Sequence, residues 1–149
     1  MSNKVFIIRG LPGAGKSNYV TLLTANLSPS DYAIHSTDHY FYSEGSYMFN
    51  PRQLEQFHQQ NQAAFGKSLQ KKVPLVICDN TNIEAWQIDN YVTLAKKYNY
   101  EIEVVSIGFF KSPQHQTLYA SRNNHNVELG VIQSMAKKSQ RFHYQQHLL

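Results

Sequence analysis

The sequence predicts an α/β fold in which a mostly parallel sheet of about four strands is flanked by helices. Strand-like and helix-like segments alternate along the chain, as they do where crossover helices join parallel strands. A continuous apolar run at residues 73–78 is typical of a central strand covered on both faces. A glycine-rich turn at residues 10–17 follows the first apolar run and precedes a helix-compatible stretch, which fits a strand, turn and helix unit.

Four segments are predicted as strands. The first covers residues 4–9, and a short second one covers residues 32–36. The third is the apolar run 73–78, where Pro74 is tolerated only at the start of the strand. The fourth, residues 101–107, alternates charged and apolar residues before it becomes mostly apolar, a pattern that allows a position at an edge of the sheet.

Helices are predicted between and after these strands. The first spans residues 16–26, and Asn50 with Pro51 forms an N-cap and first-turn pair for a second that ends near residue 71. Residues 81–84 fit a capping box that starts a third helix.

Two more helical patterns, at residues 113–122 and 128–146, are separated by a polar stretch. We expect residues 113–128 to form a helical lid, although a plain surface loop between two packing helices fits the same pattern.

Length and composition favour one domain over residues 1–149. With 42% hydrophobic and 16% charged residues, the chain can form one core but is too short for separate catalytic and substrate domains. The net charge of +4 suits an anionic ligand and is too small to indicate a nucleic-acid surface by itself. The single cysteine, Cys78, excludes an internal disulfide and favours a reducing compartment.

Several classes of protein are disfavoured by patterns that the chain lacks. The N-terminus has no apolar stretch typical of a signal peptide, and no run approaches the length of a membrane span, so we expect a cytoplasmic protein without a membrane partner. The seven histidines lack the spacing of a zinc site. The oligomeric state is not indicated by the sequence.

The segment Gly-Leu-Pro-Gly-Ala-Gly-Lys-Ser, at residues 10–17, fits the phosphate-binding P-loop pattern G-x-x-x-x-G-K-[ST]. Its glycines let successive backbone N–H groups form an anion nest, while Lys16 reaches the β- and γ-phosphates and the Ser17 hydroxyl can ligate Mg²⁺. The sequence therefore predicts a bound nucleoside triphosphate, taken as ATP, together with Mg²⁺. The residues expected to contact it are Gly10, Pro12, Gly13, Ala14, Gly15, Lys16, Ser17, Asn18 and, from the later part of the chain, Arg122.

Three charged residues can supply the chemistry of phosphoryl transfer. Asp38 follows the second predicted strand and is a candidate general base for an acceptor hydroxyl, although an Asx turn explains it equally well. Asp79 ends the third strand, as a Walker B carboxylate that supports Mg²⁺ does, and could also tie down the next helix. Arg122 precedes the polar lid stretch, where its guanidinium could stabilise the transferred phosphoryl group or complement a helix C-terminus.

Four further residues are candidate contacts for a substrate. His39 and His125 adjoin proposed site residues, and Asn82 follows Asp79 closely, but exposed histidines without such a role are common. Tyr40 belongs to an aromatic cluster that could stack on a base or pack its own loop onto the following helix.

Taken together, five ordered motifs resemble the P-loop kinase family of phage polynucleotide kinase, in its Nedd-four-binding-protein-two-like branch of AAA-type ATP-binding domains. The motifs are residues 9–17, 36–41, 49–51, 79–82 with Trp86, and 122–125. The resemblance spans about residues 5–135 and implies a three-layer P-loop NTPase fold. It also implies that Asp38 is the general base for a polynucleotide 5′-hydroxyl, Asp79 the motif carboxylate and Arg122 the lid arginine.

This chain departs from the family pattern on the acceptor side. His39 and Phe41 occupy places where the phage enzyme has an aspartate and a phosphate-contacting arginine. Asn126 stands where that enzyme has a second lid arginine, and Glu128 where the related branch has proline.

The sequence thus predicts an ATP- and Mg²⁺-dependent phosphotransferase that acts on a hydroxyl, with a polynucleotide 5′-end favoured by resemblance alone. Two alternatives are kept. One is an interaction module that binds and slowly hydrolyses ATP without transfer, and the other is a small-molecule kinase whose pocket is formed by Tyr40, Phe41 and Tyr47.

Overall fold

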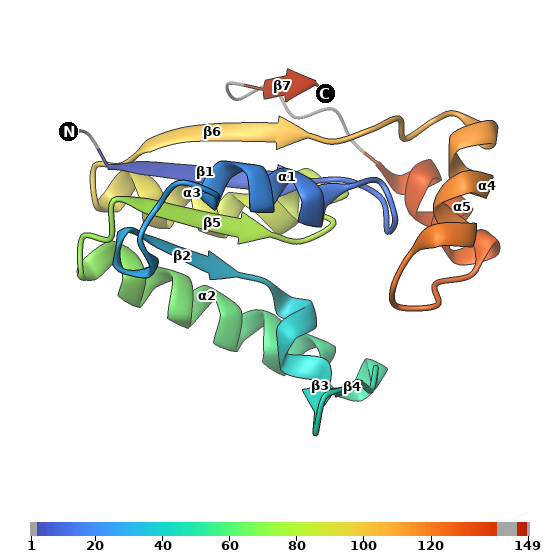
Figure 1. Cartoon of the computed structure of the whole chain (residues 1–149), viewed down its shortest axis with the longest axis horizontal. Helices are drawn as coiled ribbons and strands as arrows, with labels where there is room; N and C mark the ends of the chain where they lie inside the picture. The colour runs from blue at the N-terminus through green and yellow to red at the C-terminus, as the bar shows by residue number, and fades with distance from the viewer. Residues whose placement is uncertain (1–2, 140–145, 149) are drawn as a thin grey trace.

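The computed structural model describes residues 3–139 and 146–148, and its centre is a five-stranded sheet with the order β2-β5-β1-β6-β7 (Figure 1). The strands are β1 (Lys4–Arg9), β2 (Tyr32–His35), β5 (Leu75–Asp79), β6 (Glu101–Ser106) and β7 (Gln146–Leu148). All four pairings are parallel, so the carboxyl ends of the strands share one edge of the sheet. The predicted parallel α/β sheet is confirmed.

Helices cover both faces of this sheet. They are α1 (Lys16–Thr24), α2 (Leu54–Gln70), α3 (Ala85–Lys97), α4 (Pro113–Arg122) and α5 (Leu129–Lys138). Short 3₁₀ turns, η1 (Pro29–Asp31), η2 (Thr37–Phe41) and η3 (Pro51–Gln53), join some of the elements, and β3 (Tyr42–Ser43) with β4 (Ser46–Tyr47) forms a small antiparallel hairpin. None of the helices in the described part of the chain is long and apolar enough to cross a membrane.

The two-residue alternation along β1 produces the three layers. Val5 and Ile7 point into a core shared with α2 and α3, where Phe65 and Tyr91 are almost fully buried. Ile8, one residue further on, belongs to the opposite core, which α1 closes. Because successive strand side chains point to opposite faces, one apolar strand serves both layers.

The helices α4 and α5 lie beyond the carboxyl ends of the strands (Figure 1). A third apolar cluster joins them to the P-loop, with Leu11 and Ile83 packed against Tyr119, Ile132 and Ala136. We call residues 113–128, which are α4 and the loop after it, the lid.

The C-terminal part of the chain corrects two predictions. The helix predicted over residues 128–146 ends at Lys138, because Ser139 adopts an extended backbone, and residues 140–145 lie outside the described residues. Gln146 belongs instead to β7, which pairs with residues 104–106, so the carboxyl half of β6 is not an edge. A three-residue strand has too little local pattern to be predicted, because only its neighbour stabilises it.

The start of α3 also differs from the prediction. The capping box is formed by Glu84 and Gln87, whose side chains reach each other's backbone N–H groups, and not by residues 81–84. Asn82 is buried with a φ of +49°, so the chain is still turning there. Residue spacing alone could not distinguish these two frames.

Candidate active site

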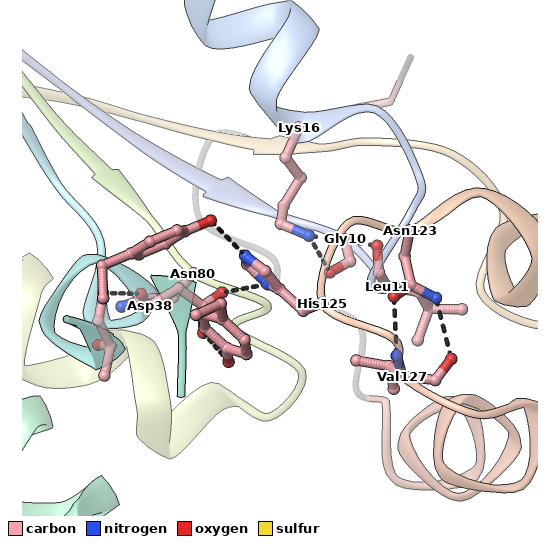
Figure 2. Close-up of polar contacts among 11 residues, drawn as sticks. Gly10, Leu11, Lys16, Asp38, Asn80, Asn123, His125 and Val127 are labelled. Carbon is pink, nitrogen blue, oxygen red and sulfur yellow. Dashed lines mark hydrogen bonds and ion pairs between the residues drawn. The ribbon is translucent and has the colours of Figure 1, made fainter. Parts of the chain in front are cut away.

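The P-loop lies between β1 and α1 and is folded around Lys16. Gly13 and Gly15 have φ values of +83° and +109°, a left-handed conformation that favours glycine. The Lys16 ammonium group donates to the carbonyls of Gly10 at 3.0 Å and Leu11 at 3.2 Å (Figure 2). The curled shape of the loop therefore depends on three residues, the two glycines and the lysine that bonds to the loop's own carbonyls.

Burial lowers the pKa of Lys16, while the charges of Asp79 and Asp38 act in the opposite direction. Burial raises the pKa of Asp79, against the effect of Lys16 and His39. Lys16 and the two carboxylates thus lie within electrostatic reach of one another at the carboxyl edge of the sheet.

The residues present fit a magnesium ion that is completed by phosphates. Mg²⁺ prefers hard oxygen ligands, keeps several waters, and is usually bound by one or two protein groups together with substrate phosphates. The Ser17 hydroxyl at the start of α1 and the desolvated Asp79 carboxylate offer such oxygens. Within the described residues no group of three His, Cys, Asp or Glu side chains could hold a metal alone.

Asp38 lies on η2, which is fixed at its start by Asn80. The Asn80 Oδ1 atom accepts a 2.8 Å hydrogen bond from the backbone N–H of Thr37, and the Thr37 hydroxyl lies 3.1 Å from Nδ1 of His58. The Asp38 side chain remains 46% exposed, so an acceptor can approach it. Asn80, the residue after the motif aspartate Asp79, therefore positions the candidate base, and no pattern in the sequence indicated this role.

Two side chains from other segments contact the Asp38 carboxylate. The Tyr47 hydroxyl donates to Oδ1 at 3.1 Å, and Nδ1 of His125 in the lid lies 3.5 Å from Oδ2 (Figure 2). Burial and the Asp38 charge together raise the pKa of Tyr47, so its hydroxyl stays protonated and can donate the hydrogen bond to Asp38.

Arg122 connects the lid to the P-loop. Its Nε atom donates to the Gly13 carbonyl at 2.7 Å, and its guanidinium lies over the Tyr119 ring at 5.2 Å. A Cβ on Gly13 would lie 2.5 Å from the Tyr119 carbonyl oxygen. The glycine is therefore needed for the close approach of α4 as well as for its φ.

Arg9 is a buried anchor that the sequence reasoning missed. It is 2% exposed and donates to the carbonyls of Asn82 and Ile83, both at 2.9 Å, and to the Ser106 hydroxyl at 3.3 Å. Its guanidinium also lies over the Phe110 ring. It fixes the segments after β5 and β6 beside the P-loop, and the signal was an arginine at the end of an apolar strand.

The four candidate substrate contacts lie in different environments in the structure. Asn82 is 2% exposed and its amide donates to the Ile8 carbonyl, so it supports the loop and does not face a substrate. Tyr40 stacks on Phe57 and packs its loop onto α2, while His39 is exposed. His125 lies beside Asp38, as described above.

Residues 5–141 match a protein family described as an AAA domain. The chain belongs to this AAA-domain family. Human NEDD4-binding protein 2 is 36% identical over 141 residues, which make up 91% of this chain and 8% of that protein. The chain therefore spans less than a tenth of the length of this relative. The expected family relationship is confirmed.

Solved structures show the same fold at low sequence identity. A chain of the Pnkp1/Rnl/Hen1 RNA repair complex has a TM-score of 0.68 and 15% identity, covering 92% of this chain and 44% of that chain. A gluconokinase from Sinorhizobium meliloti 1021 has a TM-score of 0.64 and 15% identity, and the match covers 97% of this chain and 81% of the gluconokinase chain. This AAA-domain chain thus has the three-layer fold of P-loop kinases, as the sequence predicted.

Proposed function

We propose that this protein transfers the γ-phosphoryl group of ATP to a hydroxyl acceptor. The observation that carries the proposal is the convergence at one edge of the sheet of the P-loop lysine, two carboxylates and a lid arginine. Lys16, Asp38 and Asp79 lie within electrostatic reach of one another, and Arg122 contacts the P-loop through Gly13. Phosphoryl transfer needs this set because catalysis is mainly positioning and charge neutralisation.

Each residue has a separate role in the proposed step. The acceptor oxygen forms a bond to the γ-phosphorus, the bond to the β,γ-bridging oxygen breaks, and ADP leaves with that electron pair. The acceptor's proton passes to the Asp38 carboxylate. Lys16 and Arg122 stabilise the charge on the transferring group and on the β-phosphate. Mg²⁺, held through Ser17 and Asp79, neutralises phosphate charge when it is bound.

A polynucleotide 5′-hydroxyl is the first candidate acceptor, supported by the motif resemblance and by the RNA repair complex among the structural neighbours. A small-molecule hydroxyl is the second, favoured by a cavity of about 620 Å³ beside η2. Half of the residues that line it are aromatic, namely Tyr40, Phe41, Tyr42, Phe49 and Phe57. Phe41, which occupies the place of the phage enzyme's arginine, is 3% exposed and packs within this cluster. A cytoplasmic location, where ATP is abundant, accompanies either acceptor.

The test is transfer of labelled phosphate from ATP to 5′-hydroxyl oligonucleotides and to a panel of nucleosides and sugars. We expect transfer to one class, lost in Asp38→Asn with ATP binding retained, and both lost in Lys16→Ala. Asp89→Asn, an exposed aspartate on α3, is the matched control. Intact ATP binding without transfer to any acceptor would reject the proposal in favour of a nucleotide-binding interaction module.

A further inference from the structure

The loop at the end of the lid is an ordered structure braced by Asn123. Its Nδ2 atom donates to the Val127 carbonyl at 2.9 Å and to the Tyr119 carbonyl at 3.0 Å, and its Oδ1 accepts from the Val127 N–H at 2.8 Å. These bonds close residues 123–127 into a compact turn whose tip carries His125 (Figure 2). The position of His125 is therefore determined by the backbone of the lid.

The His125 imidazole contacts three side chains, Asp38 on η2 and Tyr42 and Tyr47 on the β3–β4 hairpin. It stacks on Tyr47 with ring centroids 3.9 Å apart and planes 11° from parallel. Its Nε2 atom lies 3.2 Å from the Tyr42 hydroxyl, and its Nδ1 lies 3.5 Å from Asp38 Oδ2. Only 24% of the side chain is exposed. An imidazole with its proton on Nδ1 satisfies this arrangement, donating toward Asp38 and accepting from Tyr42.

Besides the packing of Tyr119 against Leu11 and Gly13, the lid has two polar attachments that lie three residues apart. Arg122 attaches it to the P-loop at Gly13, and His125 attaches it to the β3–β4 hairpin beside Asp38. The apolar packing and Arg122 hold α4 on the P-loop, whereas the contact at His125 holds the loop that follows α4. A group that acts on a phosphoryl transition state must be held within a fraction of an ångström, because small misplacements cost large factors in rate.

We propose that His125 is a positioning residue: by docking the lid on Tyr42 and Tyr47 beside Asp38, it holds Arg122 in register with the P-loop. The inference rests on the proposed phosphotransfer and links its acceptor side to its phosphate side. His125 acts through Arg122, and it does not itself contact the reacting atoms.

The first test compares steady-state transfer by wild type, His125→Ala and the neighbouring exposed control Asn124→Ala, using the acceptor found in the screen. We expect His125→Ala to lower kcat about tenfold, since the misplaced group acts in the transition state, with KM for ATP changed less than about twofold. His125→Phe, which keeps the stack on Tyr47, and His125→Asn, which keeps a donor toward Asp38, should each restore part of the rate.

A double-mutant cycle tests whether His125 works through Arg122. Adding His125→Ala to Arg122→Ala should then lower kcat no further, because the side chain being positioned is already absent. A full tenfold loss in both backgrounds would overturn the proposal, as would a kcat for His125→Ala equal to that of Asn124→Ala.

Hydrogen exchange separates this inference from the phosphotransferase proposal, since it needs no acceptor. In His125→Ala we expect residues 123–127 and the β3–β4 hairpin to exchange faster than in the wild type. In Asn124→Ala we expect the exchange rates of these segments to be unchanged. Unchanged exchange would overturn the docking role at any level of activity. Faster exchange with no transfer by any variant, wild type included, would support the docking and reject the proposed function.

Discussion

The carbonyl oxygen of Gly13 in the P-loop accepts a 2.7 Å hydrogen bond from Nε of Arg122, which lies 109 residues later in the chain. The contact forms where the glycine lets α4 approach, since a Cβ there would collide with the Tyr119 backbone. The P-loop and the lid are thus joined by a hydrogen bond and a steric fit at one residue.

Gly13→Ala should separate the lid from the P-loop. The new Cβ would lie 2.5 Å from the Tyr119 carbonyl oxygen, at a φ of +83°. The left-handed backbone alone costs about 1–2 kcal/mol, and the collision adds to it. We therefore expect urea denaturation to show a loss of unfolding free energy larger than this backbone cost. ATP binding should also weaken at least about tenfold, because the anion nest of the P-loop loses its geometry.

Gly45→Ala is the matched control for that variant. Gly45 has a similar φ of +81° with no atom within 4 Å of the added Cβ. It should show the backbone cost without the collision and leave ATP binding unchanged. Equal effects of the two variants would contradict a role for the close approach.

Asn80→Ala should loosen η2 and with it Asp38. The Thr37 N–H, which belongs to a residue only 4% exposed, would lose its 2.8 Å acceptor. Leaving a buried donor unpaired costs about 1–3 kcal/mol, which denaturant unfolding would measure. We also expect transfer to fall while ATP binding persists. Asn90→Ala, on the exposed surface of α3, should change neither quantity.

Arg9→Lys should be strongly destabilising although the charge is conserved. A lysine cannot reproduce the fork that reaches the Asn82 and Ile83 carbonyls together with the Ser106 hydroxyl. We expect a loss of about 2–4 kcal/mol by urea denaturation, since hydrogen bonds from charged groups contribute more than neutral ones. Arg52→Lys makes the same change on an exposed residue, and a similar loss there would contradict the explanation.

His35 should make the stability depend on pH. Burial, with a smaller effect of His39, lowers the pKa of His35 from 6.5 to about 4. Between these values the unfolded chain binds a proton that the folded protein does not, so the stabilising contribution is complete above pH 6.5 and is lost as the pH falls toward 4.

The measurement is the free energy of unfolding in urea from pH 7 to 4, compared between wild type and His35→Gln. The glutamine keeps an amide near the Ser68 hydroxyl, which lies 2.8 Å from Nε2 of His35, and it does not titrate. The free energy of unfolding of the wild type should decrease relative to that of His35→Gln as the pH falls from 6.5 toward 4. Parallel curves would show that His35 titrates normally.

The elements that sequence predicted well are those with a strong local pattern. The apolar run of β1, the P-loop glycines and the Pro113 start of α4 each depend on neighbouring residues, so their bounds agreed closely with the structure. The capping box of α3 was placed three residues early, because two overlapping frames carry suitable side chains. Three-residue β7 has no such pattern and depends on β6 for its hydrogen bonds.

The sequence by itself determined the fold class, the phosphate loop and the residue types available for phosphoryl transfer, because periodicity and glycine spacing act over a few residues. Only the tertiary structure decided how these residues meet. The pairing of Arg122 with Gly13, of His125 with Asp38 and of Arg9 with Asn82 spans 73 to 109 residues of chain. Such contacts depend on the parallel order of the strands, which brings their carboxyl ends to one edge, and no local pattern encodes them.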